Sequence, residues 1–505
     1  MGGLIMTYGY QALLMVTGLW LTPFLLRRIG QHDYGLWLVG TQLLLYLTLA
    51  DFGIVALLPI EAAQATGRGG GAENAHDLAQ IVGETTRLVL YQLPIVGLIA
   101  LALWLTIPAE WYGLRWPLAI ALGGYVLCFP LRILPALLHG LQDLTFVNGM
   151  QIAAWAINTS LIVLLVLARW NLFALAVGWT ISQLALAPVF GYRLWTRFPH
   201  VVPRRIPSLA WNSAKAHLGK GFWVSVAQVA QLLIAGTDLL VIGRLLGPAA
   251  VVPYSCTGKL ASVVGNQVTM LMHNAGPGLC ELKAAESRHR IFTVVSALSQ
   301  GVLTFSGLIF CVVLLVNHWF VDWWVTAHQY GGFVLTLLFL VAVVVRHWTG
   351  VASNTVFYFG HQRRISLTNL LDGFVTVITT VLLVKFLGPA GAVIGSIAGA
   401  CLASLPLNLW VIARDSGVSV THIVRAMLGG WFWRFALIAT GIGFIATRWS
   451  PKSLVEAIAA VAAATISYCV IMLPNLIRGP LGTYIRQFRD SFRGKYAALQ
   501  IRFSS

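Results

Sequence analysis

Long runs of apolar residues, separated by short polar segments, recur along the whole chain. A helix needs about 20 apolar residues to cross a bilayer, and each run is close to that length. The pattern therefore predicts fourteen transmembrane helices, with both ends of the chain on the same side of the membrane. The runs cover approximately 6–26, 36–58, 84–107, 115–139, 146–168, 171–195, 221–243, 251–273, 292–316, 332–357, 367–384, 389–411, 431–448 and 454–474.

Composition agrees with this pattern. The 505 residues are 58% hydrophobic and only 10% charged, and the mean hydropathy is +0.80. Such a balance excludes a soluble globular protein, so the predicted fold class is an all-α polytopic membrane protein. The six cysteines form no CxxC pair, which indicates neither a disulfide framework nor a zinc site. We expect no cofactor and no metal.

The distribution of basic residues predicts the orientation. Each loop is numbered by the predicted span that it follows. Of the 33 lysines and arginines, 20 lie in the termini and even-numbered loops, 8 in odd-numbered loops, and five within spans. Because basic loops stay in the cytoplasm, both termini are expected there. Orientation explains the net charge of +17 better than nucleic-acid binding does, so no nucleic-acid partner is expected.

Similar positions recur at a nearly constant spacing. Four pairs lie 217 to 220 residues apart, which predicts two six-helix copies related by a pseudo-two-fold axis along the membrane normal. The pairs are Gly30 with Gly247, Gly140 with Gly360, Gly178 with Gly395, and Pro188 with Pro406. The predicted domains are an N-lobe (1–196), a basic cytoplasmic linker (197–219), a C-lobe (220–413), two extra helices (414–476) and a basic cytoplasmic tail (477–505).

Polar residues three and four positions apart form stripes on five spans, and residues at this spacing share one face of a helix. These faces cannot point at lipid. Hydrogen bonding between helices is one explanation. Stripes on both copies favour a second one, an aqueous cavity between the lobes. The predicted polar lining of this cavity is Gln228, Gln231, Ser262, Asn266, Asn158 and Asn354.

Three of the five cations within the predicted spans are expected to belong to this cavity: Arg346, Lys259 and Arg132. Charges inside a membrane are costly and mark functional sites. Arginine donates two hydrogen bonds to a phosphate and lysine acts on it as a point charge, so we expect these cations to hold an anionic group. The structural alternative is ion pairing with a carboxylate inside the membrane. The carboxylates are Asp51, Asp238 and Asp372, which are also candidates for binding a coupling ion, H⁺ or Na⁺.

Prolines within spans are candidate bends, because they remove a backbone hydrogen bond. They are Pro94, Pro130, Pro135 and Pro253.

Four short segments carry a family resemblance: TPFLLRRIGQHDYGLW (22–37), LADFGI (49–54), GTDLLVIGRLLGP (236–248) and KFLGPAGAVIGSIAGA (385–400). Over about residues 6–476 the chain resembles the polysaccharide and oligosaccharide flippases of the multidrug/oligosaccharidyl-lipid/polysaccharide exporter superfamily. The resemblance implies two six-helix lobes and alternating access. It also implies a cationic cavity, into which Arg132, Lys259 and Arg346 fall by position.

The same resemblance implies a function. Such flippases move undecaprenyl-diphosphate-linked sugars from the cytoplasmic to the periplasmic leaflet for O-antigen or exopolysaccharide synthesis. The implied location is the bacterial inner membrane. The implied partners are lipid-linked oligosaccharide, membrane phospholipid and sugar-assembly or polymerisation proteins.

Three other functions compete with this one. A multidrug antiporter of the same superfamily usually has twelve spans and a more acidic cavity. A membrane glycosyltransferase or glycan polymerase typically needs a large outward loop or an acidic metal-binding pair. Here the longest outward loop (317–330) is short and no DxD occurs. A scaffold would not need polar stripes. We therefore expect a transporter rather than an enzyme.

Overall fold

The computed structural model describes residues 2–67, 72–201, 203, 211–274, 279, 288–479 and 481–482. Every regular element in these ranges is a helix, which confirms the all-α class. The chain forms two compact units, Met1–Val252 and Pro253–Ser505, and each is described by itself. The tail predicted at 477–505 lies almost wholly outside the described residues, as does most of the linker before Trp211.

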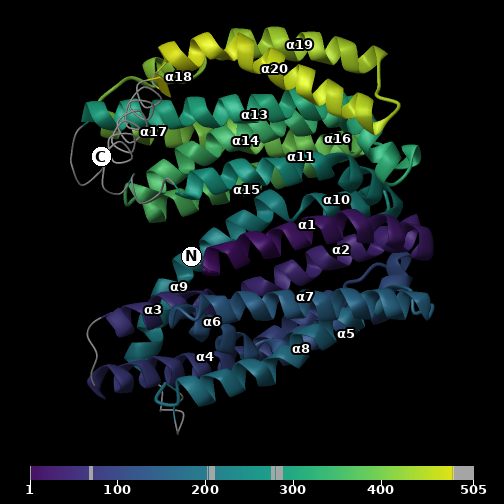
Figure 1. Cartoon of the computed structure of the whole chain (residues 1–505). Helices are drawn as coiled ribbons and strands as arrows, with labels where there is room; N and C mark the ends of the chain where they lie inside the picture. Colours follow the sequence, from purple (N-terminus) through teal and green to yellow (C-terminus); the bar gives the residue numbers. More distant parts are fainter. Residues whose placement is uncertain are drawn as a thin grey trace, which may run out of the picture. The chain divides into compact units, whose positions relative to one another are not determined.

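The first unit is built from helical hairpins, among them the pair α7 and α8 (Figure 1). Its helices are α1 (Gly2–Ile29), α2 (Gln31–Leu47), η1 (Thr48–Asp51), α3 (Ile54–Gly67), α4 (Ala72–Leu105), η2 (Ala109–Trp111), α5 (Tyr112–Cys128), η3 (Pro130–Arg132), α6 (Ile133–Gly140), α7 (Leu144–Leu167), α8 (Leu172–Arg197), α9 (Trp211–Ala235), α10 (Asp238–Leu245) and the first residues of α11 (Pro248–Asn274).

The second unit packs around α13. In an apolar stretch of 18 residues on this helix, 72% of the residues are buried. The pair α19 and α20 lies against it (Figure 1). The helices of this unit are the rest of α11, α13 (Arg288–Trp324), η4 (Ala327–Gln329), α14 (Phe333–Tyr358), α15 (Gln362–Leu387), α16 (Ala390–Gly399), the π-helix η5 (Ala400–Ser404), α17 (Leu405–Ser416), α18 (Val420–Leu428), α19 (Phe432–Arg448) and α20 (Leu454–Arg478).

The described helices provide most of the predicted spans directly. Nine are long and apolar enough to cross a membrane, and the number rises to 13 if each of four bent helix pairs is one span. The remaining predicted span, 251–273, corresponds to α11, which has 27 residues and would reach about 40 Å at 1.5 Å per residue. Its length suffices to cross, but the polar stripe lowers its hydropathy. The chain is a multi-pass membrane protein.

Four spans bend, and only one of them bends at a predicted proline. That bend, 51°, joins α5 to α6 through Pro130. The other three bends, of 53°, 48° and 46°, fall next to Gly53, Gly236 and Gly429. Of the other predicted bend sites, Pro94 and Pro253 lie inside continuous helices, and Pro135 lies in the first turn of α6. Glycine, which lacks a Cβ, is the usual site of these breaks.

Backbone dihedrals support the internal repeat. Three pairs of turn residues have positive φ at the same spacing as the repeat: Gly30 (85°) and Gly247 (90°), Gln142 (62°) and Gly360 (89°), Asn171 (46°) and Gly388 (61°). The separations are 217 (247 − 30), 218 (360 − 142) and 217 (388 − 171). Positive φ is uncommon for residues with a side chain, so its recurrence in both copies is informative.

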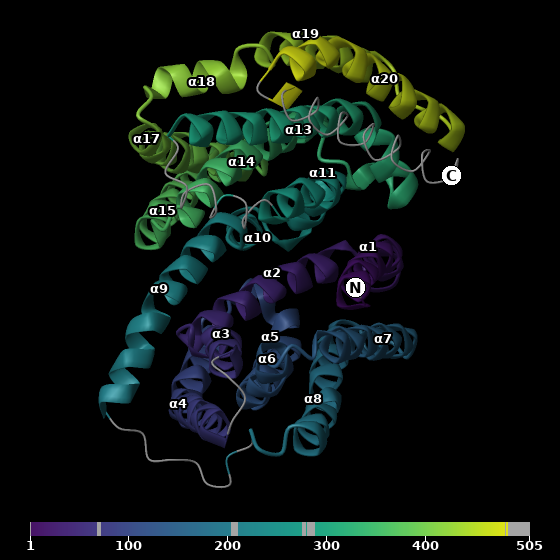
Figure 2. The ribbon, with the colours of Figure 1, turned by 60° about the vertical axis from the view of Figure 1, so that its left-hand side comes forward.

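The boundary between the compact units lies after Val252, later in the chain than the predicted start of the C-lobe at 220. Helix α9 begins at Trp211, so the last nine residues of the predicted linker, 211–219, are helical. Helices α9 and α10, which begin the second copy by sequence, pack against α2, η1 and α3 of the first unit (Figure 2). The lobe boundaries drawn from the repeat stay a prediction.

Candidate functional site

Arg346 on α14 lies at the centre of a hydrogen-bond network inside the second unit. Its Nη1 donates to Asp372 Oδ2 at 2.7 Å, and its Nη2 donates to Asp372 Oδ1 at 3.0 Å. Nε donates to Ser396 Oγ at 3.0 Å, and Nη2 also reaches the Ser396 carbonyl and Thr376 Oγ1. The ion-pair alternative is therefore confirmed for this arginine, which joins α14, α15 and α16.

The network is enclosed on the carboxylate side and partly open on the guanidinium side. Asp372 is 1% exposed, whereas Arg346 is 20% exposed. A Cβ at Gly399 would overlap both Thr376 and Asp372, so the glycine lets α16 approach α15 at this level. The π-helix η5 starts directly after Gly399, and π-helices often occur at functional sites.

Arg132 and Asp51 form a looser pair in the first unit. The Nη2 of Arg132 lies 3.9 Å from Asp51 Oδ2, and its Nη1 donates to the Tyr125 hydroxyl at 2.8 Å. Asp51 Oδ1 accepts from the Val55 amide at 3.0 Å, which fixes the carboxylate at the break between η1 and α3. Asp51 is 1% exposed and Arg132 is 35% exposed, so this guanidinium is also accessible.

Lys259 on α11 has no ion-pair partner among the residues that the structure describes. It is half-buried, and Ser262 donates to its carbonyl oxygen at 2.9 Å. Ser262 and Asn266, on the same stripe, are exposed. The polar face of α11 therefore carries a cation whose charge no described carboxylate offsets.

The other predicted lining residues have different environments. Gln228 on α9 is half-buried, and its Oε1 has no hydrogen-bond partner in the described part of the chain. Gln231 is exposed, and Asp238 starts α10 beside the 48° bend. Asn354 is half-buried on α14.

Asn158 lies in a pocket within the first unit, a place that the sequence did not predict. The pocket has a volume of about 490 Å³ and lies among α1, α6, α7 and α8. Its walls combine indole rings with amides and a hydroxyl. Asn158 Oδ1 and Trp155 Nε1 are buried there without a hydrogen-bond partner in the described structure. The polar residues and rings that line it are Tyr10, Gln151, Trp155, Asn158, Trp179, Ser182 and Gln183.

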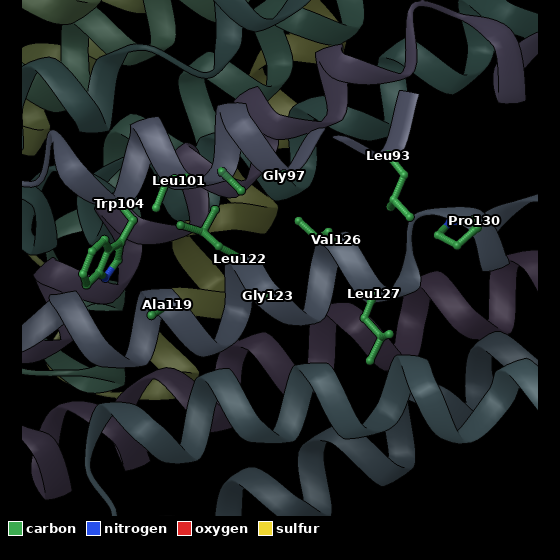
Figure 3. A pocket seen from close by; sticks show the side chains of 11 residues that line it. Leu93, Gly97, Leu101, Trp104, Ala119, Leu122, Gly123, Val126, Leu127 and Pro130 are labelled. Carbon is green, nitrogen blue, oxygen red and sulfur yellow. The ribbon is translucent and has the colours of Figure 1, made fainter. Parts of the chain in front are cut away.

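Two further pockets are almost entirely apolar. One, of about 690 Å³, lies between α4 and α5, with Gly97 and Gly123 in its floor (Figure 3). Its indole nitrogen, on Trp104, donates to the Arg115 carbonyl rather than into the pocket. The other, of about 540 Å³, lies among α11, α13 and α20. Neither offers a charged group, so neither suits an anionic headgroup.

A histidine between two glutamates is the feature that the sequence analysis missed. His217 on α9 lies 3.4 Å from Glu61 Oε2 through Nδ1 and 3.3 Å from Glu84 Oε2 through Nε2. The glutamates come from α3 and α4. Glu61 follows the predicted apolar run 36–58 by about one turn, and this charged residue was the available signal. His217 falls in the predicted linker (197–219), so its contacts with Glu61 and Glu84 were not predicted.

Comparison with known proteins places the fold. No family model and no curated protein matches this chain. Among solved structures, the chain is similar to the lipid II flippase MurJ in an inward closed conformation, with a TM-score of 0.60 and 10% identity over 94% of this chain and 99% of that one. It is also similar to an inward-facing multidrug resistance MATE family transporter of the MOP superfamily, with a TM-score of 0.53 and 14% identity over 78% and 95%. These likenesses confirm the expected two-lobe transporter fold.

Proposed function

We propose that this chain is a flippase that moves undecaprenyl-diphosphate-linked oligosaccharides across the bacterial inner membrane. The substrate passes from the cytoplasmic to the periplasmic leaflet by alternating access, and the product supplies O-antigen or exopolysaccharide synthesis. Both termini lie in the cytoplasm. The observation that carries this proposal is the arrangement of Arg346, a guanidinium inside the membrane that is held by a buried carboxylate and is itself partly exposed.

A diphosphate is a suitable partner for an arginine, as a carboxylate is. Both anions accept two parallel hydrogen bonds from the guanidinium fork. Without substrate, Asp372 neutralises Arg346 and keeps an uncompensated charge out of the membrane interior. A diphosphate that approaches the exposed side of Arg346 adds negative charge beside the pair. Lys259, with no described carboxylate, then supplies the balancing positive charge.

The pocket around Asn158, within the first unit, has a lining of the kind that binds sugars. Indole rings pack against the apolar faces of sugars, and amides hydrogen-bond to their hydroxyls. The pocket offers Trp155 and Trp179 for the first role and Gln151, Asn158 and Gln183 for the second. Its two unsatisfied buried atoms have hydrogen-bonding capacity that a sugar can meet.

One comparison favours a second candidate, a multidrug transporter, because the MATE structure shares this fold. The flippase reading is better supported, since the MurJ likeness covers 94% of this chain and the MATE likeness covers 78%. Two in-membrane arginines also suit an anionic substrate better than the cationic compounds that an acidic cavity would select.

The deciding experiment uses a strain that lacks this gene. Its lipid-linked sugars are extracted and identified, with the wild-type gene restored as the control. A complete, unpolymerised lipid-linked repeat on the cytoplasmic leaflet supports the flippase and identifies its cargo. A glycan that lacks one sugar would point to a glycosyltransferase. No accumulation, together with new drug sensitivity, would favour the multidrug transporter.

A further inference from the structure

His217 has a carboxylate oxygen on each side of its ring. Nδ1 faces Glu61 at 3.4 Å, and Nε2 faces Glu84 at 3.3 Å. The other oxygen of Glu84 is already held, because Gln80 Nε2 donates to it at 2.9 Å. All three ionisable side chains are largely buried, so the cluster is built into the packing of α3, α4 and α9.

Of these two contacts, the one with Glu84 has hydrogen-bond geometry and the one with Glu61 is at ion-pair distance. A neutral histidine has one N–H and one lone pair, so it can donate to only one of the two glutamates and turns a lone pair toward the other. An imidazolium has an N–H on each side of the ring, so it donates a charge-assisted bond to Glu84 and turns a positive charge toward Glu61. The proton therefore decides whether one side chain ties α9 to both neighbouring helices or to only one.

Other charged residues lie on the same elements and on η1. On α9, Lys215 lies two residues before His217 and Lys220 three residues after it. On α4, Arg87 lies one turn beyond Glu84. Asp51 belongs to η1, which also packs against α9, and its carboxylate is held by Val55.

The cluster lies one turn before a close backbone contact between α9 and the break that follows η1. One turn further along α9, a Cβ at Gly221 would overlap the Phe52 carbonyl, and a Cβ at Gly53 would lie 2.7 Å from the Gly221 carbonyl. The two backbones are therefore in direct contact. His217 lies near the start of α9, so loss of its contacts with Glu61 and Glu84 loosens the first two turns of the helix.

We propose that His217 is a proton-binding site, and that its proton fastens the start of α9 to Glu61 on α3 and Glu84 on α4. The proton comes from and returns to cytoplasmic water; no other bond is made or broken. Among the described residues, no group of three or more His, Cys, Asp or Glu is placed so that it could hold a metal ion. This inference rests on the proposed function, because it names H⁺ as the ion to which movement of α9 during transport is coupled.

Hydrogen–deuterium exchange tests the site without any transport substrate. The full chain in nanodiscs is compared at pH 6 and pH 8, with exchange corrected for the intrinsic pH effect and referenced to α13. In the wild type we expect 211–221 and 54–67 to exchange roughly tenfold more slowly at pH 6, as charge-assisted bonds form. His217→Gln should remove this difference. His361→Gln, which alters a single histidine–carboxylate pair with Asp415 in the other unit, is the matched control and should keep it.

Glu84→Gln serves as a second variant and should also remove the difference, since an amide cannot accept the same charge-assisted bond. Equal exchange at both pH values in the wild type, or a difference that survives in both His217→Gln and Glu84→Gln, would overturn the proton site. Failure of the proposed function is seen separately: a gene-deletion strain without lipid-linked intermediates would refute the flippase and leave the exchange result intact.

Discussion

Arg346 and Asp372 depend on each other inside the second unit. Removing one partner of a buried pair leaves an uncompensated charge and costs about 3–5 kcal/mol, while removing both can be nearly neutral. Asp372 is 1% exposed, so it belongs to this class. We expect Arg346→Ala and Asp372→Ala each to lower the thermal midpoint of the purified protein, and the double variant to recover most of the loss. Thermal unfolding in detergent measures this.

The double variant also separates folding from transport. If Arg346 binds the diphosphate, the Arg346→Ala/Asp372→Ala protein is stable and inactive, and the gene-deletion strain carrying it accumulates lipid-linked sugar. Full transport by this stable variant would show that the arginine has a structural role only. Asp372→Asn keeps the shape of the side chain and serves as the matched control for cavity effects.

Gly399 is the position where the packing of this network is tightest. A Cβ there would overlap Thr376 and Asp372. We expect Gly399→Ala to destabilise the protein by about 1–3 kcal/mol, as overpacked cores are. Gly441→Ala on α19, where a Cβ meets nothing within 4 Å, is the control. Equal thermal midpoints for the two variants would contradict the close contact between α15 and α16.

Single residues were predicted better than their pairings. The sequence indicated Arg346, Asp372, Arg132 and Asp51 separately, because charges stand out in apolar runs. It could not indicate which cation meets which carboxylate. That depends on the rotation of helices whose partners lie 26 and 81 positions apart (372 − 346 and 132 − 51).

Helix α9 packs on η1 and α3 through paired glycines. A Cβ at Gly221 would overlap the Phe52 carbonyl, whereas a Cβ at Gly219, two residues earlier on the same helix, meets nothing. We expect Gly221→Ala to cost about 1–3 kcal/mol. Gly219→Ala should be neutral or stabilising by up to about 1 kcal/mol, because alanine favours a helix. Thermal unfolding of the two variants checks this, and a more stable Gly221→Ala protein would contradict the contact.

The hydrophobic pattern predicted the lengths and polar faces of the helices. It did not predict the bends beside glycines or the packing of α9 against the first unit. Hydropathy located the spans because burial in lipid acts on each helix separately. The bends beside Gly53, Gly236 and Gly429 depend on contacts that a neighbouring helix imposes. The packing of α9 against the first unit was also not predicted. An internal repeat shows which segments correspond in sequence, but it does not show which copy a helix packs against.

The orientation of the chain is a prediction from its basic loops, and reporters can test it. We expect green fluorescent protein fused after residue 505 to fluoresce, because that end is predicted to lie in the cytoplasm. Alkaline phosphatase inserted between α13 and α14, near Ala327, should be active, because that loop is predicted to face the periplasm. The opposite pattern at both sites would reverse the proposed direction of flipping.

The first compact unit ends at Val252, well beyond the six spans of the first copy. This has a consequence for biosynthesis. Domains made on the ribosome fold in order from the N-terminus, but this unit lacks α9 and α10 until about half of the chain has been translated. Until then Gly35 and Gly53, whose faces later receive Pro248 and Gly221, have no packing partner. The nascent chain therefore inserts the six predicted spans of the first copy and must wait for α9 and α10 before its first folding unit is complete.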